Sequence, residues 1–221
     1  MRCFVWLVLL WWILPCARAS GTVVAAPRFN LDGRTASALS VAWWQWAKSF
    51  PDGEGPVDDT TGADCALGQA GKVWFLAGGF GSSKIQRTCT IPAHKSIFFP
   101  VINMVYWRAR DSHAETCKIA RHNASLNNRT PPELYVEVDG VPVKDVLAYR
   151  ATTPRCFDLY KRVPVTVPHY NAYPSASDGF WILLRPLSKG THTIKFGGKY
   201  HNDTAALGNM QQDIEYTAIV K

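Results

Sequence analysis

The chain has 221 residues, of which 47% are hydrophobic, so it is long enough to bury the core of one ordinary domain. Its 24 Lys and Arg exceed its 17 Asp and Glu, for a net charge of +7, but the basic residues are scattered along the chain. Basic and aromatic residues do not alternate as in RNA-binding proteins, so no nucleic-acid partner is expected. The mild positive charge instead favours attraction to anionic polymers or cell-surface groups.

Residues 1–19 have the organisation of an export signal. Arg2 gives a positive start, Phe4–Leu14 is an apolar run, and Ala17–Ala19 places small residues where a signal peptidase reads them. The apolar run is too short to cross a membrane, which takes about 20 helical residues, and no later stretch is longer, so no transmembrane segment is expected. We predict cleavage before Ser20 and a secreted or periplasmic protein with a remaining net charge of +5.

The cysteines indicate two disulfides. Cys3 and Cys16 leave with the signal; acylation of Cys16, as in a lipoprotein, is disfavoured by the preceding Pro15. The four that remain are Cys65, Cys89, Cys117 and Cys156. An even number in an oxidising compartment predicts two bridges, and of three connectivities we favour Cys65–Cys89 and Cys117–Cys156, which close the shorter loops. A metal site of His113, Cys117 and His122 is the alternative, but its spacing matches no familiar zinc pattern.

In chain order, residues 20–34 are small and polar and predict a flexible lead-in. A helix is expected from Thr35 to about Ser49, because Leu39, Trp43 and Trp46 recur at helical spacing. Short apolar or alternating segments then predict strands at 72–76, 85–91, 96–101, 134–138, 141–146, 180–184, 191–196 and 214–220.

Residues 108–132 are polar and predict an exposed insertion with a short helix near 113–121. Because short strands separated by Gly and Pro turns dominate, we expect a mainly β protein. The predicted fold is one antiparallel, jelly-roll-like β-sandwich over residues 35–221, with an N-terminal Trp-rich helix packed on its edge and two disulfides.

The tryptophans of the predicted helix allow two interpretations. Trp43 and Trp46 share the apolar stripe and are expected in the core, whereas Trp44 points elsewhere. Trp44 is therefore either a second anchor of the helix or, with Trp107 or Trp181, an exposed platform on which a sugar ring stacks.

Three carboxylates, Asp58, Asp59 and Asp64, lie within seven residues on a Gly-rich loop. Clustered oxygen ligands suit calcium, although the spacing is not that of an EF-hand; turns and caps are the simpler interpretation, and no cofactor is expected. Carboxylates would also serve a glycoside hydrolase, for which the candidates are Asp58, Asp59, Glu133, Glu137 and Asp178. The sequence contains neither a Gly-x-Ser-x-Gly nor a His-Glu-x-x-His motif.

Several motifs together resemble a group of exported, mostly bacterial proteins whose function is uncharacterised. They are Trp43-x-x-Trp46, Asp59-x-Thr61-Gly62-x-x-Cys65, Gly68-Gln69-x-Gly71-x-Val73-Trp74-Phe75-Leu76-Ala77-Gly78, Arg87-x-Cys89-x-Ile91-Pro92 and Phe98-Phe99-Pro100-Val101-Ile102-Asn103. The resemblance covers most of residues 43–103 and 180–220. It implies no activity and favours a bacterial source, in which the glycosylation triplets at Asn123, Asn128 and Asn202 would carry no glycan.

These features lead to the hypothesis of an exported binding module for a glycan or cell-envelope polymer. Its expected ligand-binding residues are Trp44, Trp107, Asp59 and Asp64. A secreted hydrolase of polysaccharide or peptidoglycan is the second hypothesis. A structural or inhibitory envelope protein without a small-ligand site is the third. The sequence leaves the oligomeric state open.

Overall fold

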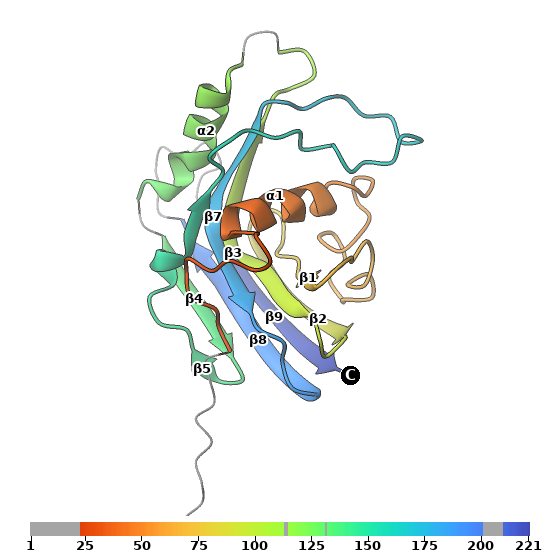
Figure 1. Cartoon of the computed structure of the whole chain (residues 1–221), viewed down its shortest axis with the longest axis vertical. Coiled ribbons are helices and arrows are strands. Elements are labelled where there is room, and N and C mark those ends of the chain that lie inside the picture. Colours follow the sequence, from red (N-terminus) through yellow and green to blue (C-terminus); the bar gives the residue numbers. More distant parts are fainter. Residues whose placement is uncertain (1–22, 113–114, 131, 201–209) are drawn as a thin grey trace, which may run out of the picture.

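A computed structural model describes residues 23–112, 115–130, 132–200 and 210–221; the predicted signal peptide and Asn202 lie outside them. The described chain is mainly β, with two sheets and two short α-helices, α1 (Ala36–Ala47) and α2 (Cys117–Ser125) (Figure 1). The strands are β1 (Val73–Phe75), β2 (Ser83–Ile91), β3 (Ser96–Trp107), β4 (Glu133–Val138), β5 (Val141–Pro142), β6 (Arg150–Thr152), β7 (Ser175–Leu184), β8 (Gly190–Lys199) and β9 (Gln211–Val220). Short 3₁₀ turns occupy Leu126–Asn128 and Val146–Tyr149.

The first sheet has the order β1-β3-β7-β6 and the second β2-β9-β8-β4-β5. They pack against each other through alternating apolar side chains, with the rings of Phe99 and Phe196 4.5 Å apart between the sheets. Burying each of these two rings away from water stabilises the folded state by roughly 1.5–3 kcal/mol. None of the helices in the described part of the chain is long and apolar enough to cross a membrane.

The expectation of purely antiparallel sheets was wrong. β1 pairs with β3 in parallel, and β2 pairs in parallel with β9 along its whole length, whereas the other ladders are antiparallel. Alternation of apolar residues identifies a strand but not the direction of its partner, and a parallel pair only needs a connection long enough to cross over. The jelly-roll arrangement stays a prediction.

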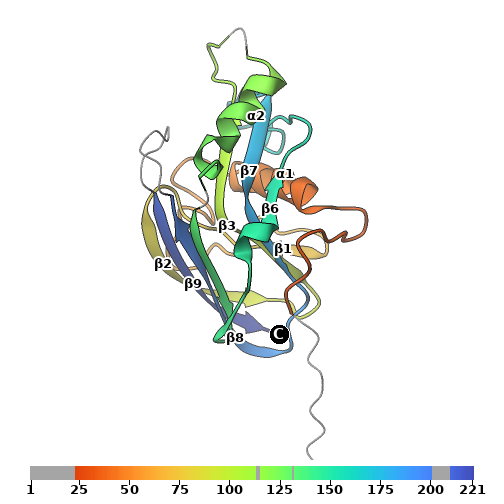
Figure 2. The same cartoon turned by 90° about the vertical axis from the view of Figure 1, so that its left-hand side faces the viewer.

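Helix α1 covers the face of the first sheet that points away from the second (Figure 2). Thr35 caps its start by accepting a hydrogen bond from the N–H of Ala38. Trp43 and Trp46 are buried as predicted, and their indole N–H groups donate to the carbonyl oxygens of Leu76 and Leu67. The helix is thereby fixed to the loops on both sides of β1.

Both predicted disulfides are confirmed. Cys65–Cys89 joins the loop before β1 to β2, and Cys117–Cys156 joins the first residue of α2 to the segment after β6. Cys117 is therefore no metal ligand, and His113 lies outside the described residues.

The lead-in differs from its prediction where it is described. Val24 forms a β-bridge with Leu184, and the N–H of Ala25 donates to Leu183, so this segment is anchored on β7. Asn128, in the second glycosylation triplet, is only 2% exposed, so the folded chain has no room for a glycan there.

Candidate functional site

A groove with a volume of about 380 Å³ lies where the end of α1 meets β3, β9 and the loop after β1. We call it the Trp107 groove. Its lining residues are Trp43, Trp44, Lys48, Val57, Gly79, Phe80, Gly81, Ser82, Asn103, Met104, Val105, Trp107, Met210 and Gln212. The structure thus brings together Trp44 and Trp107, which lie far apart in the sequence.

Trp44 is not the exposed platform that one interpretation predicted. It is 6% exposed, its indole N–H donates to the hydroxyl of Ser177 at 3.0 Å, and its ring meets that of Trp43 edge to face. Because α1 lies flat on the first sheet, both Trp43 and Trp44 contact it. Trp44 therefore forms part of the groove wall and anchors the helix.

The aromatic surface open to a ligand comes from two other residues. Trp107, at the end of β3, is only partly buried, and Phe80, in the loop after β1, is 47% exposed. The ammonium of Lys48 lies 4.8 Å from the centre of the Phe80 ring, a cation–π contact that places a positive charge at the rim. Phe80 was not singled out from the sequence because it stands in a Gly-rich turn without periodicity.

Asn103 gives the groove an unused hydrogen-bond donor. Its side-chain nitrogen is buried and has no partner among the described residues. The opposite residue on β7 is Gly179, where a side chain's Cβ would lie only 2.7 Å from the Cβ of Asn103. A buried amide without a partner costs about 1–3 kcal/mol, which a ligand oxygen would recover.

Arg87, another polar residue of the quoted motifs, has structural partners. Arg87, 3% exposed, donates to the carbonyl oxygens of Val57, Asp59 and Gly78 and to the hydroxyl of Tyr216. Such charge-assisted bonds hold the loop before β1 onto β2.

Gln69 acts in the same way on β1. Its amide donates to the carbonyl of Phe75 and accepts from the N–H of the same residue. These motif residues serve the fold, whereas Asn103, which lines the groove, has a buried side-chain nitrogen without a partner among the described residues.

Asp59 and Asp64, predicted as ligand-binding residues, do not line the Trp107 groove. The Asp59 carboxylate accepts hydrogen bonds from the N–H groups of Thr61, Gly62 and Asp64 and from the hydroxyl of Thr61. Partial burial alone would raise the pKa of Asp59, but these hydrogen bonds outweigh it and lower the pKa below its usual value.

Asp59 is therefore engaged in holding its own loop. In the described ranges, no three His, Cys, Asp or Glu side chains are placed to share a metal ion, which leaves the calcium hypothesis without support from geometry.

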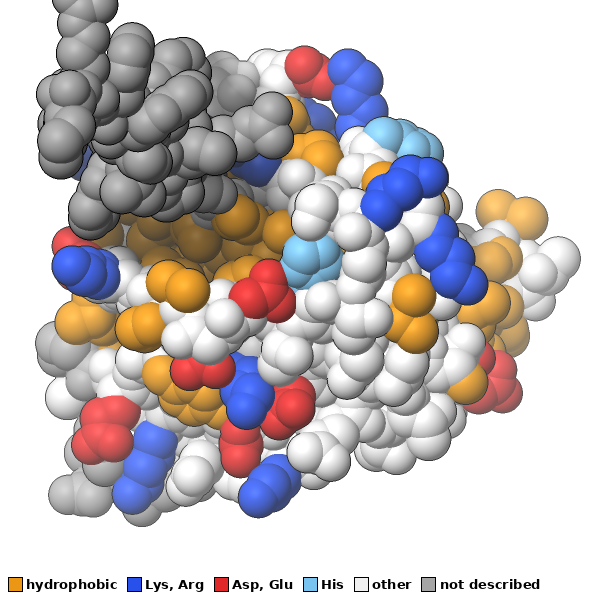
Figure 3. Space-filling model, turned by 90° about the horizontal axis from the view of Figure 1, so that it is seen from below, with side chains coloured by type: hydrophobic (Ala, Val, Ile, Leu, Met, Phe, Trp, Pro, Cys, Tyr) orange, Lys and Arg blue, Asp and Glu red, His pale blue; other side chains and the backbone are white. Residues whose placement is uncertain are grey.

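Hydrophobic side chains gather in a hollow on the lower face of the molecule (Figure 3). Asp139, which lines a largely apolar hollow, belongs to a Ser-His-Asp arrangement that sequence reasoning missed. His192 Nδ1 is 2.7 Å from Asp139, while its Nε2 is 2.9 Å from the carbonyl oxygen of Ser188 and 3.4 Å from the Ser188 hydroxyl. Carboxylate and carbonyl both accept, so both ring nitrogens donate and no lone pair is left to activate the serine. The arrangement ties β8 to the β4–β5 turn.

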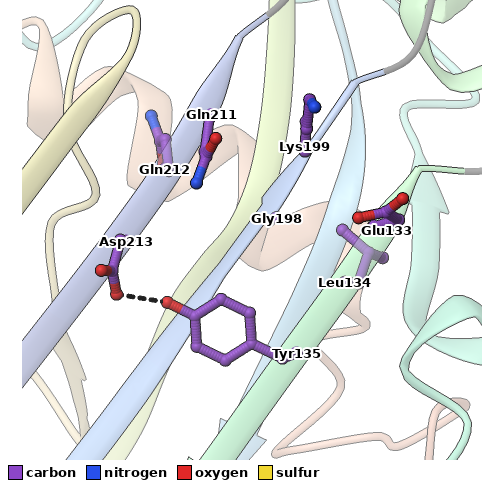
Figure 4. A pocket seen from close by; sticks show the side chains of 8 residues that line it. All are labelled: Glu133, Leu134, Tyr135, Gly198, Lys199, Gln211, Gln212 and Asp213. Atoms are coloured by element: carbon purple, nitrogen blue, oxygen red, sulfur yellow. Dashed lines mark hydrogen bonds between the residues drawn. The ribbon is translucent and has the colours of Figure 1, made fainter.

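A second hollow, of about 570 Å³, lies on the outer face of the second sheet (Figure 4). The Tyr135 hydroxyl reaches across β8 to donate to Asp213. Gly197 lies between them in register, and a Cβ there would be 2.9 Å from that hydroxyl. Burial, followed by the hydrogen bond to Asp213, raises the pKa of Tyr135. This contact links β4 to β9. Tyr135 is the only aromatic residue in the described lining of this hollow, and its hydroxyl is already engaged by Asp213.

No protein-family model matches the chain, and no curated protein matches it. Among solved structures, the solution structure of Amebosin is similar at 9% sequence identity and a TM-score of 0.21, over 62% of this chain and 97% of Amebosin. A TM-score this low carries no argument about fold or function.

Proposed function

We propose that the protein is an exported binding module and that the Trp107 groove takes a glycan or cell-envelope polymer. The observation that carries the proposal is the unpartnered amide nitrogen of Asn103 in a groove with aromatic walls. The predicted export signal and the two disulfides are compatible with a secreted or periplasmic location.

The lining has the chemistry that sugar recognition requires. Trp107 and Phe80 offer apolar faces for the C–H face of a pyranose ring, while the Asn103 amide donates to a hydroxyl or ring oxygen. Lys48 places an ammonium group at the rim, where it also forms an ion pair with the exposed Asp52 at 3.6 Å.

The groove supports binding better than hydrolysis. A glycoside hydrolase needs two facing carboxylates, and the residues that line the described groove include no Asp or Glu. The carboxylate of Asp59, which the hydrolase hypothesis invoked, is engaged by its own loop. An envelope protein acting through a flat surface would have no use for a buried free donor.

Glycan-array screening followed by calorimetry on a bound glycan tests the proposal. Asn103→Leu and Trp107→Ala should each weaken binding about tenfold or more, because each should remove roughly 1.4 kcal/mol or more of binding free energy. Tyr135→Ala, which removes an aromatic ring from the other hollow, should bind as well as the parent chain.

Leucine at position 103 keeps the branched shape of asparagine and leaves no unpaired donor, so this variant should be about as stable as the parent. Binding that survives Asn103→Leu and Trp107→Ala but is lost in Tyr135→Ala would overturn the assignment of the groove.

A further inference from the structure

A polar cleft of about 570 Å³ separates α2 from β6, the edge strand of the first sheet. Figure 2 shows the helix above this edge. We propose that this cleft is an anion site that binds the sulfate or phosphate ester groups of a carbohydrate polymer. It shares no residue with the Trp107 groove, so either proposal stands or fails without the other.

The positive charge of the cleft comes from α2. Lys118 and Arg121 lie on the exposed face of the helix, line the cleft, and form no hydrogen bond or ion pair with the described residues. The helix itself contains no acidic residue that would neutralise them. Two unpaired cations one helical turn apart are placed to hold one oxyanion between them.

The one carboxylate in the lining does not oppose an anion. Asp178 is 2% exposed, and its two oxygens accept three hydrogen bonds, two from Arg150 and one from Asn128, each 2.9 Å long. The Arg150–Asp178 pair is therefore internally neutral. The charge that faces the cleft is that of Lys118 and Arg121.

The opposite wall supplies a neutral donor on a fixed frame. Thr152 of β6 lines the cleft with its hydroxyl group, whereas the Ser125 hydroxyl, at the end of α2, already donates to the carbonyl oxygen of His122. The Cys117–Cys156 bridge holds the start of α2 to the segment that follows β6. The walls are thus tied together before a ligand arrives, which lowers the ordering cost of binding. An ester oxyanion, with several acceptors, matches the two cations and the Thr152 hydroxyl.

The test uses fluorescently labelled dextran sulfate oligosaccharides and the full chain, with unsulfated dextran as the neutral probe. Fluorescence anisotropy of Lys118→Gln/Arg121→Gln should show binding of dextran sulfate about tenfold weaker than in the parent, because two charge-assisted hydrogen bonds are lost. The matched control, Lys84→Gln/Lys189→Gln, removes the same charge from two other exposed positions and should change the affinity less than about twofold.

Equal losses in the two double variants would show attraction by net charge alone and would overturn the proposal. So would unchanged binding in Lys118→Gln/Arg121→Gln, or equal binding of unsulfated dextran by the parent. Inorganic sulfate and phosphate serve as competitors: displacement of the oligosaccharide at concentrations equal in ester groups would assign the cleft to the free ion and overturn its assignment to a polymer. Thermal unfolding should be the same in both variants, since all four side chains are exposed.

Discussion

The indole N–H of Trp44 donates to the hydroxyl of Ser177 on β7, so a residue that borders the Trp107 groove also attaches α1 to the first sheet. Loss of this hydrogen bond would therefore disturb the wall of the groove as well as the position of the helix.

Trp44→Ala should lower the free energy of unfolding by about 3–5 kcal/mol, because it leaves a large cavity and an unpaired Ser177 hydroxyl. Trp107→Ala should lower the free energy of unfolding clearly less, since Trp107 is only partly buried. Urea unfolding followed by circular dichroism measures both. Equal costs would mean that Trp44 does not anchor the helix.

Asp59→Asn should destabilise the protein by about 1–2 kcal/mol at neutral pH, because an amide cannot accept all four hydrogen bonds that the carboxylate receives. The folded pKa is lowered, so this stabilisation is present above the unfolded pKa of about 4 and is lost as the pH falls through the folded value. Unfolding curves of parent and variant should therefore differ at pH 7 and converge as the pH is lowered to 2.5. Asp58→Asn, at an exposed position, is the control and should change little.

The His192–Asp139 pair should make stability depend on pH in the opposite sense. Desolvation lowers the pKa of His192, but the hydrogen bonds to Asp139 and to the Ser188 carbonyl, together with the negative charge, raise it overall. The stabilisation is thus complete below the unfolded pKa of about 6.5 and is lost as the pH rises through the folded value.

Between pH 5.5 and pH 9, the parent should lose roughly 0.2–1 kcal/mol relative to His192→Gln in thermal or urea unfolding. Asp139→Asn should remove most of this difference. If the free energies of unfolding of the parent and of His192→Gln changed with pH in parallel, the result would contradict a charged His192–Asp139 pair.

Removing the first disulfide with Cys65→Ala/Cys89→Ala should cost about 3 kcal/mol, since the bridge closes a loop with a sequence separation of 24 residues. Cys117→Ala/Cys156→Ala, with a separation of 39, should cost a similar amount. The first pair should also expose the loop before β1 to limited proteolysis, and the second should expose α2. Cleavage at the same sites in both variants would show that the bridges do not act locally.

Asn128→Asp should destabilise the protein by about 2–4 kcal/mol, because it places a second carboxylate beside the buried Asp178. Asn123→Asp, at a half-buried position five residues earlier, is the matched control and should cost much less. Urea unfolding at pH 7 distinguishes them. A cost that is equal at the two positions would argue against a tight Asn128–Asp178 contact.

Much of the fold could be predicted from local pattern. The spacing of Leu39, Trp43 and Trp46 predicted α1, and alternation predicted β2 and β9 to within a few residues. β7 begins at Ser175, earlier than its apolar run suggested, because Ser177 and Asp178 are buried with partners from Trp44, Thr153 and Arg150. Hydropathy does not reveal polar residues whose hydrogen bonds are satisfied by distant segments.

The candidate site was predictable only in part. Trp44 and Trp107 were selected as aromatic residues, and they do line one groove, but the sequence did not show that Trp44 is buried or that Phe80 and Asn103 join them. Asp59 was predicted as a ligand residue, and the structure shows that its carboxylate caps its own loop, outside the groove; in sequence such a carboxylate looks the same as one that faces a ligand.

In the described part of the second sheet, β2 is an edge strand that pairs with β9, and β9 lies between β2 and β8. During translation β2 leaves the ribosome long before β9, so it waits without its hydrogen-bonding partner until residues 211–220 have been made. The sheet therefore closes late in synthesis.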